Sequence, residues 1–209
     1  MQLINAVIAV LVWVLAPLTL CIPDLSSFTI PEPHEIVDLI WTGNLTVGGP
    51  NVTLRGRSIK DINRKIYAIA PHFFAPRSTP PYESDSSVLA ARNENRLVCD
   101  NVTNGYAYSP DVVTNGNMLY ASSGLFRCAP PQPGSDVVCA RAACTNNSAV
   151  FFCNYNTDHD AIATAARIGD YSLQINNWCA DTDVGPNVKG QVFDSDNYTV
   201  VVGSDSVLC

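Results

Sequence analysis

Residues 136–154, with the sequence DVVCARAACTNNSAVFFCN, constrain the fold of this chain more than any other stretch. Two apolar runs, 137–139 and 149–153, flank the polar tetrapeptide 145–148. Short polar loops that contain Asn join antiparallel strands, because Asn tolerates a positive φ. The pattern therefore predicts a hairpin. The cysteines within it would fasten this hairpin to its neighbours and make it the centre of a disulfide-stapled sheet.

Cysteine usage indicates an oxidising compartment. No Cys-x-x-Cys pair occurs and only three His are present, so the spacing is not that of a zinc site. Clustered cysteines of this kind are typical of disulfides in secreted proteins. Seven cysteines follow Cys21, so three disulfides would leave one cysteine over. This cysteine would be a free thiol or form an intermolecular bridge, unless the signal is cut just before Cys21. The pairing stays open. The expected disulfide cysteines are Cys99, Cys128, Cys139, Cys144, Cys153, Cys179 and Cys209.

The N-terminus carries the one long apolar run, residues 4–20. It is short and interrupted by proline, so a secretory signal peptide over residues 1–21 is favoured over a membrane-spanning helix. The mature chain would begin at Ile22 and be extracellular. Five Asn-x-Ser/Thr sequons agree with secretion and predict a glycoprotein. They are Asn44, Asn51, Asn101, Asn146 and Asn197.

The first part of the mature chain, residues 22–70, is predicted to be a strand–helix segment. Its helix begins at the N-cap Ser58, carries Ile every three or four residues and stops before Pro71. Two short strands at 45–47 and 51–54 would precede the helix as a hairpin.

A Pro- and Ser-rich stretch, residues 71–96, reads as a linker. The composition changes at about Leu97, which predicts a domain boundary there. A protease cut at this boundary would make residues 22–96 a propeptide; the alternative is that the whole chain works as one unit.

The last part, residues 97–209, is predicted to be a cysteine-rich α+β domain. A strand at 125–128 and the central hairpin are followed by a helix over 158–178. A second hairpin, built from 191–193 and 198–202, closes the domain. One helix would therefore pack on an antiparallel sheet. Three tyrosines fall among the turn residues before the first strand, namely Tyr106, Tyr108 and Tyr120.

Charge is uneven along the chain. Residues 22–97 balance, whereas residues 98–209 carry all seven excess negative charges. Nucleic acids and anionic membranes need clustered Lys and Arg, so we expect neither as a partner after removal of the signal. The one basic run reads as a solvated helix face. It consists of Arg55, Arg57, Lys60, Arg64 and Lys65.

The one candidate for acid–base chemistry is His159, which lies between Asp158 and Asp160. A nuclease would need a second His or a Glu, and the cysteine-rich part contains neither. An Asp-rich helix N-terminus is the simpler interpretation. Residues 181–187 alternate oxygen-bearing side chains but lack the closing Glu of a calcium loop, so turn chemistry is favoured. We predict no catalytic residue, no metal and no cofactor, and hence no enzyme.

The block 138–154, a following helix, Cys179 and the block 188–202 resemble a group of small secreted cysteine-rich proteins of filamentous fungi, discussed as candidate effectors. The helix-on-sheet layout is also similar to that of killer-toxin-type secreted proteins. The resemblance implies apoplastic secretion and interaction with a host, and it transfers no functional residue.

Together these features predict a non-enzymatic effector or toxin-like protein that acts at a host or competitor surface. Exposed aromatic residues, Tyr106, Tyr108 and Tyr120, are the candidate contacts, although packing is an equally good interpretation of them. One alternative is a small secreted hydrolase or nuclease centred on His159. Another is a structural cell-wall glycoprotein, joined to its neighbours through the spare cysteine.

Overall fold

The computed structural model describes residues 36–46, 48–73, 94–99, 102, 104–181, 185–205 and 209. The predicted signal peptide, most of the predicted linker and Asn101 lie outside the described residues. The described part is α+β, as predicted, with three helices packed against mainly antiparallel sheets.

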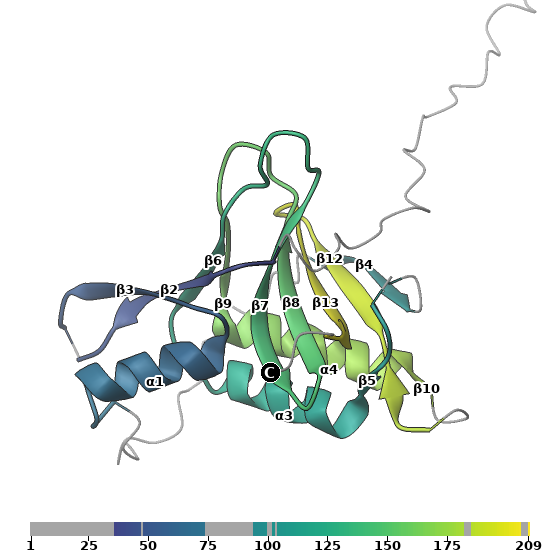
Figure 1. The fold of residues 1–209 in the computed structure, drawn as a ribbon, viewed down its shortest axis with the longest axis horizontal. Coiled ribbons are helices and arrows are strands. Elements are labelled where there is room, and N and C mark those ends of the chain that lie inside the picture. The colour runs from purple at the N-terminus through teal and green to yellow at the C-terminus, as the bar shows by residue number, and fades with distance from the viewer. Residues whose placement is uncertain are drawn as a thin grey trace, which may run out of the picture.

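A six-stranded sheet forms the centre of the molecule (Figure 1). Neighbouring strands are antiparallel except for the first pair, which is parallel. Both hairpins predicted for the cysteine-rich part form, and the first turns through Asn146 and Asn147 at φ 45° and 67°. The order across the sheet is β1 (Ile36–Val37), β7 (Val138–Thr145), β8 (Ser148–Asn154), β13 (Tyr198–Ser204), β12 (Gly190–Asp194) and β4 (Glu94–Cys99).

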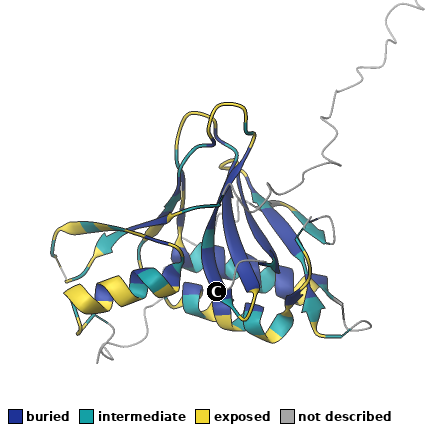
Figure 2. Ribbon diagram, in the orientation of Figure 1, coloured by how far each residue is buried: buried dark blue, intermediate teal, exposed yellow. Residues whose placement is uncertain are grey.

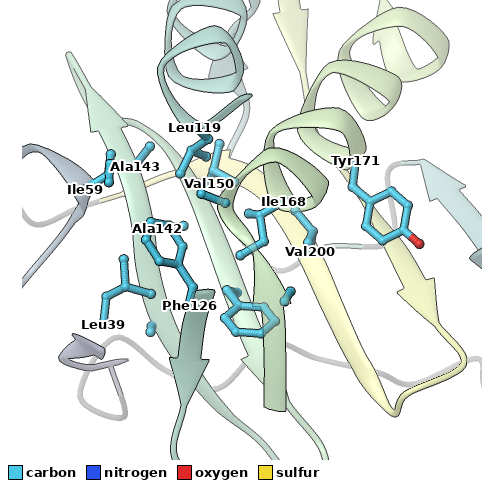
Figure 3. Packing of buried hydrophobic residues seen from close by; sticks show 14 of the residues in the cluster. Leu39, Ile59, Leu119, Phe126, Ala142, Ala143, Val150, Ile168, Tyr171 and Val200 are labelled. Carbon is cyan, nitrogen blue, oxygen red and sulfur yellow. The ribbon is translucent and has the colours of Figure 1, made fainter. Parts of the chain in front are cut away.

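Two helices, α3 (Ser109–Tyr120) and α4 (Ala165–Cys179), cover one face of this sheet (Figure 1). Figure 3 shows Leu119 and Ile168 from the helices packed with Val150 and Val200 from the strands. A smaller cluster on the other face includes Phe151, Val201 and the Cys139–Cys153 disulfide. The central strands are therefore buried on both faces (Figure 2).

Helix α3 was not predicted, because its sequence was assigned to turns. Pro110 fits the first turn of a helix and Asp111 favours a helix N-terminus. Packing against α4 then decides the structure. A Cβ built on Gly116 would come within 2.8 Å of the Leu173 and Ser172 side chains, so glycine lets the two helices approach closely.

The prediction that a helix runs over 158–178 is wrong at its beginning. The chain first forms β9 (Ala161–Thr164), and α4 starts after it. Thr164 caps this helix, since its hydroxyl accepts a hydrogen bond of 3.1 Å from the backbone N–H of Arg167. Asp158 and Asp160 therefore do not lie at the helix N-terminus.

The N-terminal lobe consists of β2 (Leu39–Asn44), β3 (Asn51–Gly56) and α1 (Ile59–Ile69), which extend to one side of the central sheet (Figure 1). The predicted helix is confirmed, with Ser58 as its N-cap. The predicted strand at 45–47 is wrong for Leu45 and Thr46, since the pairing segment is Leu39–Asn44, whose apolar residues reach the core; Val47 lies outside the described residues. The lobe joins a four-stranded sheet in the order β3, β2, β6 (Leu125–Cys128) and β9.

The lobe and the cysteine-rich part share one hydrophobic core. Leu39, Trp41 and Ile62 belong to the same buried cluster as Phe126 and Ala142. The expected boundary at about Leu97 falls inside β4, which pairs with β12. Removing residues 22–96 would therefore expose apolar surface on the remaining part.

Three disulfides fasten the cysteine-rich part: Cys99–Cys179, Cys139–Cys153 and Cys144–Cys209. The first ties the end of α4 to β4. Cys128 carries a free thiol, so its assignment to a disulfide is corrected. Its side chain is fully buried and donates to the carbonyl of Val138 at 3.6 Å.

A three-stranded sheet in the order β10 (Ala180–Asp181), β11 (Asn187–Val188) and β5 (Ala107–Tyr108) lies at one end of the helix pair. In the described part of the chain, no helix is both long and apolar enough to cross a membrane.

Candidate functional site

His159, the residue predicted for acid–base chemistry, lies in the loop between β8 and β9. Its Nδ1 is 2.6 Å from Oδ1 of Asp158, and both side chains are largely exposed. The neighbouring Asp160 pairs with Arg127 at 3.6 Å. A general base needs a reacting group held beside it. Asp158 accepts one contact from His159, and both side chains are exposed rather than enclosed.

The most densely connected polar cluster joins α4 to the β12–β13 hairpin. Oδ2 of Asp194 accepts hydrogen bonds from Tyr171 Oη at 2.6 Å and Tyr198 Oη at 2.9 Å, and it pairs with Arg167 at 3.1 Å. Asp194 is fully buried on its side-chain atoms. Burial and the neighbouring carboxylate raise the pKa of both tyrosines above the ordinary 10. The tyrosines stay neutral donors, so this cluster has a structural role.

The described residues contain no group of three His, Cys, Asp or Glu side chains that could hold a metal ion. The candidate calcium segment, residues 181–187, lies partly outside the described residues. Asp181 and Asn187 are register partners across β10 and β11.

The predicted contact residues Tyr106, Tyr108 and Tyr120 are all about half exposed. They do not form one group. Tyr106 and Tyr108 flank the buried Ala107 on β5, so both side chains lie on the solvent side of this strand. Tyr120 is the last residue of α3. This helix begins beside β5 and is about 18 Å long, so Tyr120 lies well away from the other two tyrosines.

Trp178 lies at the same end of the helix pair as the first two tyrosines. It lies in the last turn of α4 and is 73% exposed, more than any other large hydrophobic residue described. The chain continues directly into β10, where Ala180 pairs with Val188, which in turn pairs with Ala107. Two strand spacings, about 10 Å, therefore separate Ala180 from Ala107. We call Tyr106, Tyr108 and Trp178 the aromatic surface.

Several contacts hold the tyrosines of the aromatic surface in place. The Lys189 ammonium lies 4.5 Å from the centre of the Tyr106 ring, a cation–π contact. The backbone N–H of Tyr108 donates to Ser148 Oγ at 2.9 Å, and the next residue donates to the carbonyl of Pro186 at 2.7 Å. Rigid, partly polar aromatic rings of this kind give large contact area at a low entropic cost on binding.

Sequence reasoning did not identify Trp178 as a contact residue, because it entered only as the last residue of the helix predicted over 158–178. The helical repeat does not reveal its exposure, because Trp178 lies three residues after the buried Ile175, at the edge of the buried face. Ile175 and Cys179 are buried in α4 at a spacing of four, and Trp178 falls outside that buried line beside the exposed Asn177.

Comparisons of the chain with protein-family models, with curated proteins and with solved structures each found no match.

Proposed function

We propose that the chain is a secreted, N-glycosylated protein that acts without catalysis, by binding a component of a host or competitor cell surface through the aromatic surface. The single observation that carries this proposal is the gathering of Tyr106, Tyr108 and Trp178, all exposed, at one end of the helix pair. Tyr and Trp are enriched at the centres of binding interfaces, where they supply much of the binding energy.

The disulfides support extracellular action. Three bridges within residues 99–209 are typical of proteins that act in an oxidising compartment. Four predicted glycosylation sites are exposed, which leaves room for a glycan at each: Asn44, Asn51, Asn146 and Asn197. Asn44 and Asn51 are register partners on β2 and β3, so their glycans would emerge side by side.

The alternatives receive less support. A hydrolase or nuclease would depend on His159, whose one close charged neighbour is Asp158 and whose side chain is exposed. A cross-linked cell-wall glycoprotein would need an accessible spare thiol, and Cys128 is fully buried. A binding role requires neither a catalytic histidine nor an accessible thiol.

The test is retention of the fluorescently labelled, secreted protein on intact plant and fungal cells after washing. We expect Trp178→Ala and the double variant Tyr106→Ala/Tyr108→Ala each to lower retention at least tenfold, the loss typical of a central aromatic contact. Tyr120→Ala is the matched control, since it removes an equally exposed tyrosine from the other end of α3.

Equal retention of all these variants would contradict the proposal, provided that their circular dichroism spectra match the wild type. Retention lost with His159→Ala, together with a degradative activity, would favour the hydrolase instead.

A further inference from the structure

Positive charge gathers on the N-terminal lobe. Residues 51–69 hold five cationic side chains against the one carboxylate of Asp61, a formal excess of four positive charges. Residues 98–209 carry an excess of seven negative charges. The fold places the lobe to one side of the central sheet, so the two charges occupy different regions of the surface (Figure 1).

The outward face of α1 carries a definite pattern. Ile59, Ile62 and Ile66 are buried against the core. Lys60, Arg64 and Tyr67 follow one another at spacings of four and three, which places them in one line on the solvent side of the helix. We call these three residues the cationic stripe. Figure 2 shows this side of α1 as exposed.

Only some of the cationic side chains of the lobe form ion pairs within it. Asp61 pairs with Lys65 at 3.1 Å and with Arg64 at 3.8 Å. Slight burial raises the pKa of Asp61. The hydrogen bond from Lys65 and the nearby cations lower it by a larger amount, so the pKa of Asp61 lies below its usual range. Asp61 therefore stays ionised. Within the described residues, Arg55, Arg57 and Lys60 make no ion pair.

From this arrangement we propose that the outward face of α1 docks on an anionic phospholipid surface. The cations would contact the headgroups and Tyr67 would enter the interfacial layer. A soluble polyanion would need charge alone. Tyr67, at 60% exposure, adds an exposed aromatic ring at the end of the stripe, which favours a lipid surface.

The acidic part of the chain does not forbid this contact. Exposed charges more than about 8 Å apart are largely screened at physiological ionic strength, so a membrane responds to the charges nearest to it. No sequon lies on α1, so N-glycans are not attached to the docking face. The proposal departs from the expectation of no membrane partner, which was based on charge summed along the sequence rather than on where the fold places it.

The test is co-sedimentation of the full, secreted protein with vesicles of phosphatidylcholine that contain phosphatidylserine, or of phosphatidylcholine alone. We expect binding to the mixed vesicles only, with a strong decrease at high salt. Each basic residue near an anionic surface contributes roughly a fivefold factor. Lys60→Gln/Arg64→Gln should therefore weaken binding about 25-fold, and Asp61→Asn should strengthen it.

Arg96→Gln is the matched control, because it removes an exposed cation outside the lobe and should leave binding unchanged.

Tyr67→Ala distinguishes the two kinds of anionic partner, a lipid surface and a soluble polyanion. Weaker vesicle binding with unchanged retention on immobilised polygalacturonate supports the lipid surface. Unchanged vesicle binding by Tyr67→Ala or by the double variant overturns the proposal, as does equal binding to both vesicle types. Variants of the aromatic surface should bind vesicles normally, so the two proposals stand or fall separately.

Discussion

The Tyr171 hydroxyl donates a 2.6 Å hydrogen bond to the buried carboxylate of Asp194 and thereby joins helix α4 to the β12–β13 hairpin. Tyr198 and Arg167 complete the set of donors around the same oxygen. The contact connects residues 23 positions apart in the sequence and fixes the helix over the sheet.

Removing this carboxylate should destabilise the protein strongly. Asp194→Ala leaves Arg167 and two buried hydroxyls without their acceptor, which costs about 3 kcal/mol or more. Tyr171→Phe removes the hydrogen bond to the Asp194 carboxylate and those that the same hydroxyl accepts from Arg167, and should cost at least about 1.5–3 kcal/mol. Urea unfolding monitored by circular dichroism measures both. Asp196→Ala, an exposed change in the same hairpin, should have little effect; an equal loss there would contradict the role assigned to Asp194.

Gly169→Ala should destabilise the protein although it favours the helix. Alanine improves helix propensity by about 1 kcal/mol. Its Cβ, however, would lie 2.6 Å from the backbone N of Tyr120 and 2.7 Å from the carbonyl O of Gly116, so α3 and α4 must move apart. Overpacking of this kind costs about 1–3 kcal/mol. The thermal midpoint should fall for Gly169→Ala and hold or rise for the exposed Asn177→Ala in the same helix.

The three disulfides should differ in their contribution to stability. Cys99–Cys179 closes a separation of 80 residues, and Cys139–Cys153 one of 14. In the chain-entropy account the longer loop contributes about 4.5 kcal/mol and the shorter about 3 kcal/mol. Replacing each pair with Ser and comparing unfolding midpoints tests this order. Non-reducing peptide mapping should recover the same three pairs with Cys128 free; any peptide that links Cys128 to another cysteine would refute the assignment.

Burial of Cys128 should make its thiol unreactive and its contribution pH-dependent. Burial raises the pKa of Cys128 from 9.0 to about 12, although backbone hydrogen bonds act in the opposite direction. The folded state therefore keeps a proton that the unfolded chain loses. The resulting stability is complete below about pH 9 and disappears as the pH rises toward 12. Near pH 9, iodoacetamide should label the urea-unfolded protein and leave the native protein unlabelled; rapid native labelling would be the contrary result.

A cut in the predicted linker should leave the N-terminal lobe attached. Trp41 is buried, donates from Nε1 to the carbonyl of Ser123 at 2.8 Å and packs edge-on against Phe73 at 6.4 Å between ring centres. After limited proteolysis within residues 74–93, the two fragments should co-elute in gel filtration and separate only in denaturant. Trp41→Ala should cost about 3–5 kcal/mol. Elution of a folded cysteine-rich fragment alone would favour the propeptide hypothesis.

Local sequence signals account for the elements that were predicted correctly. The Asn146-Asn147 turn, the Ile stripe of α1 and the alternating strands around residues 194–197 each carry their information within a dozen residues. Helix α3 was missed because its turn-forming Asn and Gly residues conceal it. Buried Asn115 donates to the carbonyl of Ser148 at 2.8 Å and accepts from Thr145, contacts that exist only once the hairpin is in place.

By itself, the sequence determined the fold class, both hairpins of the cysteine-rich part and helix α1, because these depend on residue type and short spacing. Only the tertiary structure decided which cysteine is spare, because disulfide pairing depends on which segments, far apart in the sequence, lie side by side in the fold. It also decided that Trp178 lies at the same end of the helix pair as Tyr106 and Tyr108, and that the basic residues of α1 lie to one side of the central sheet. Exposure and proximity are properties of the packed chain, so no local pattern could specify them.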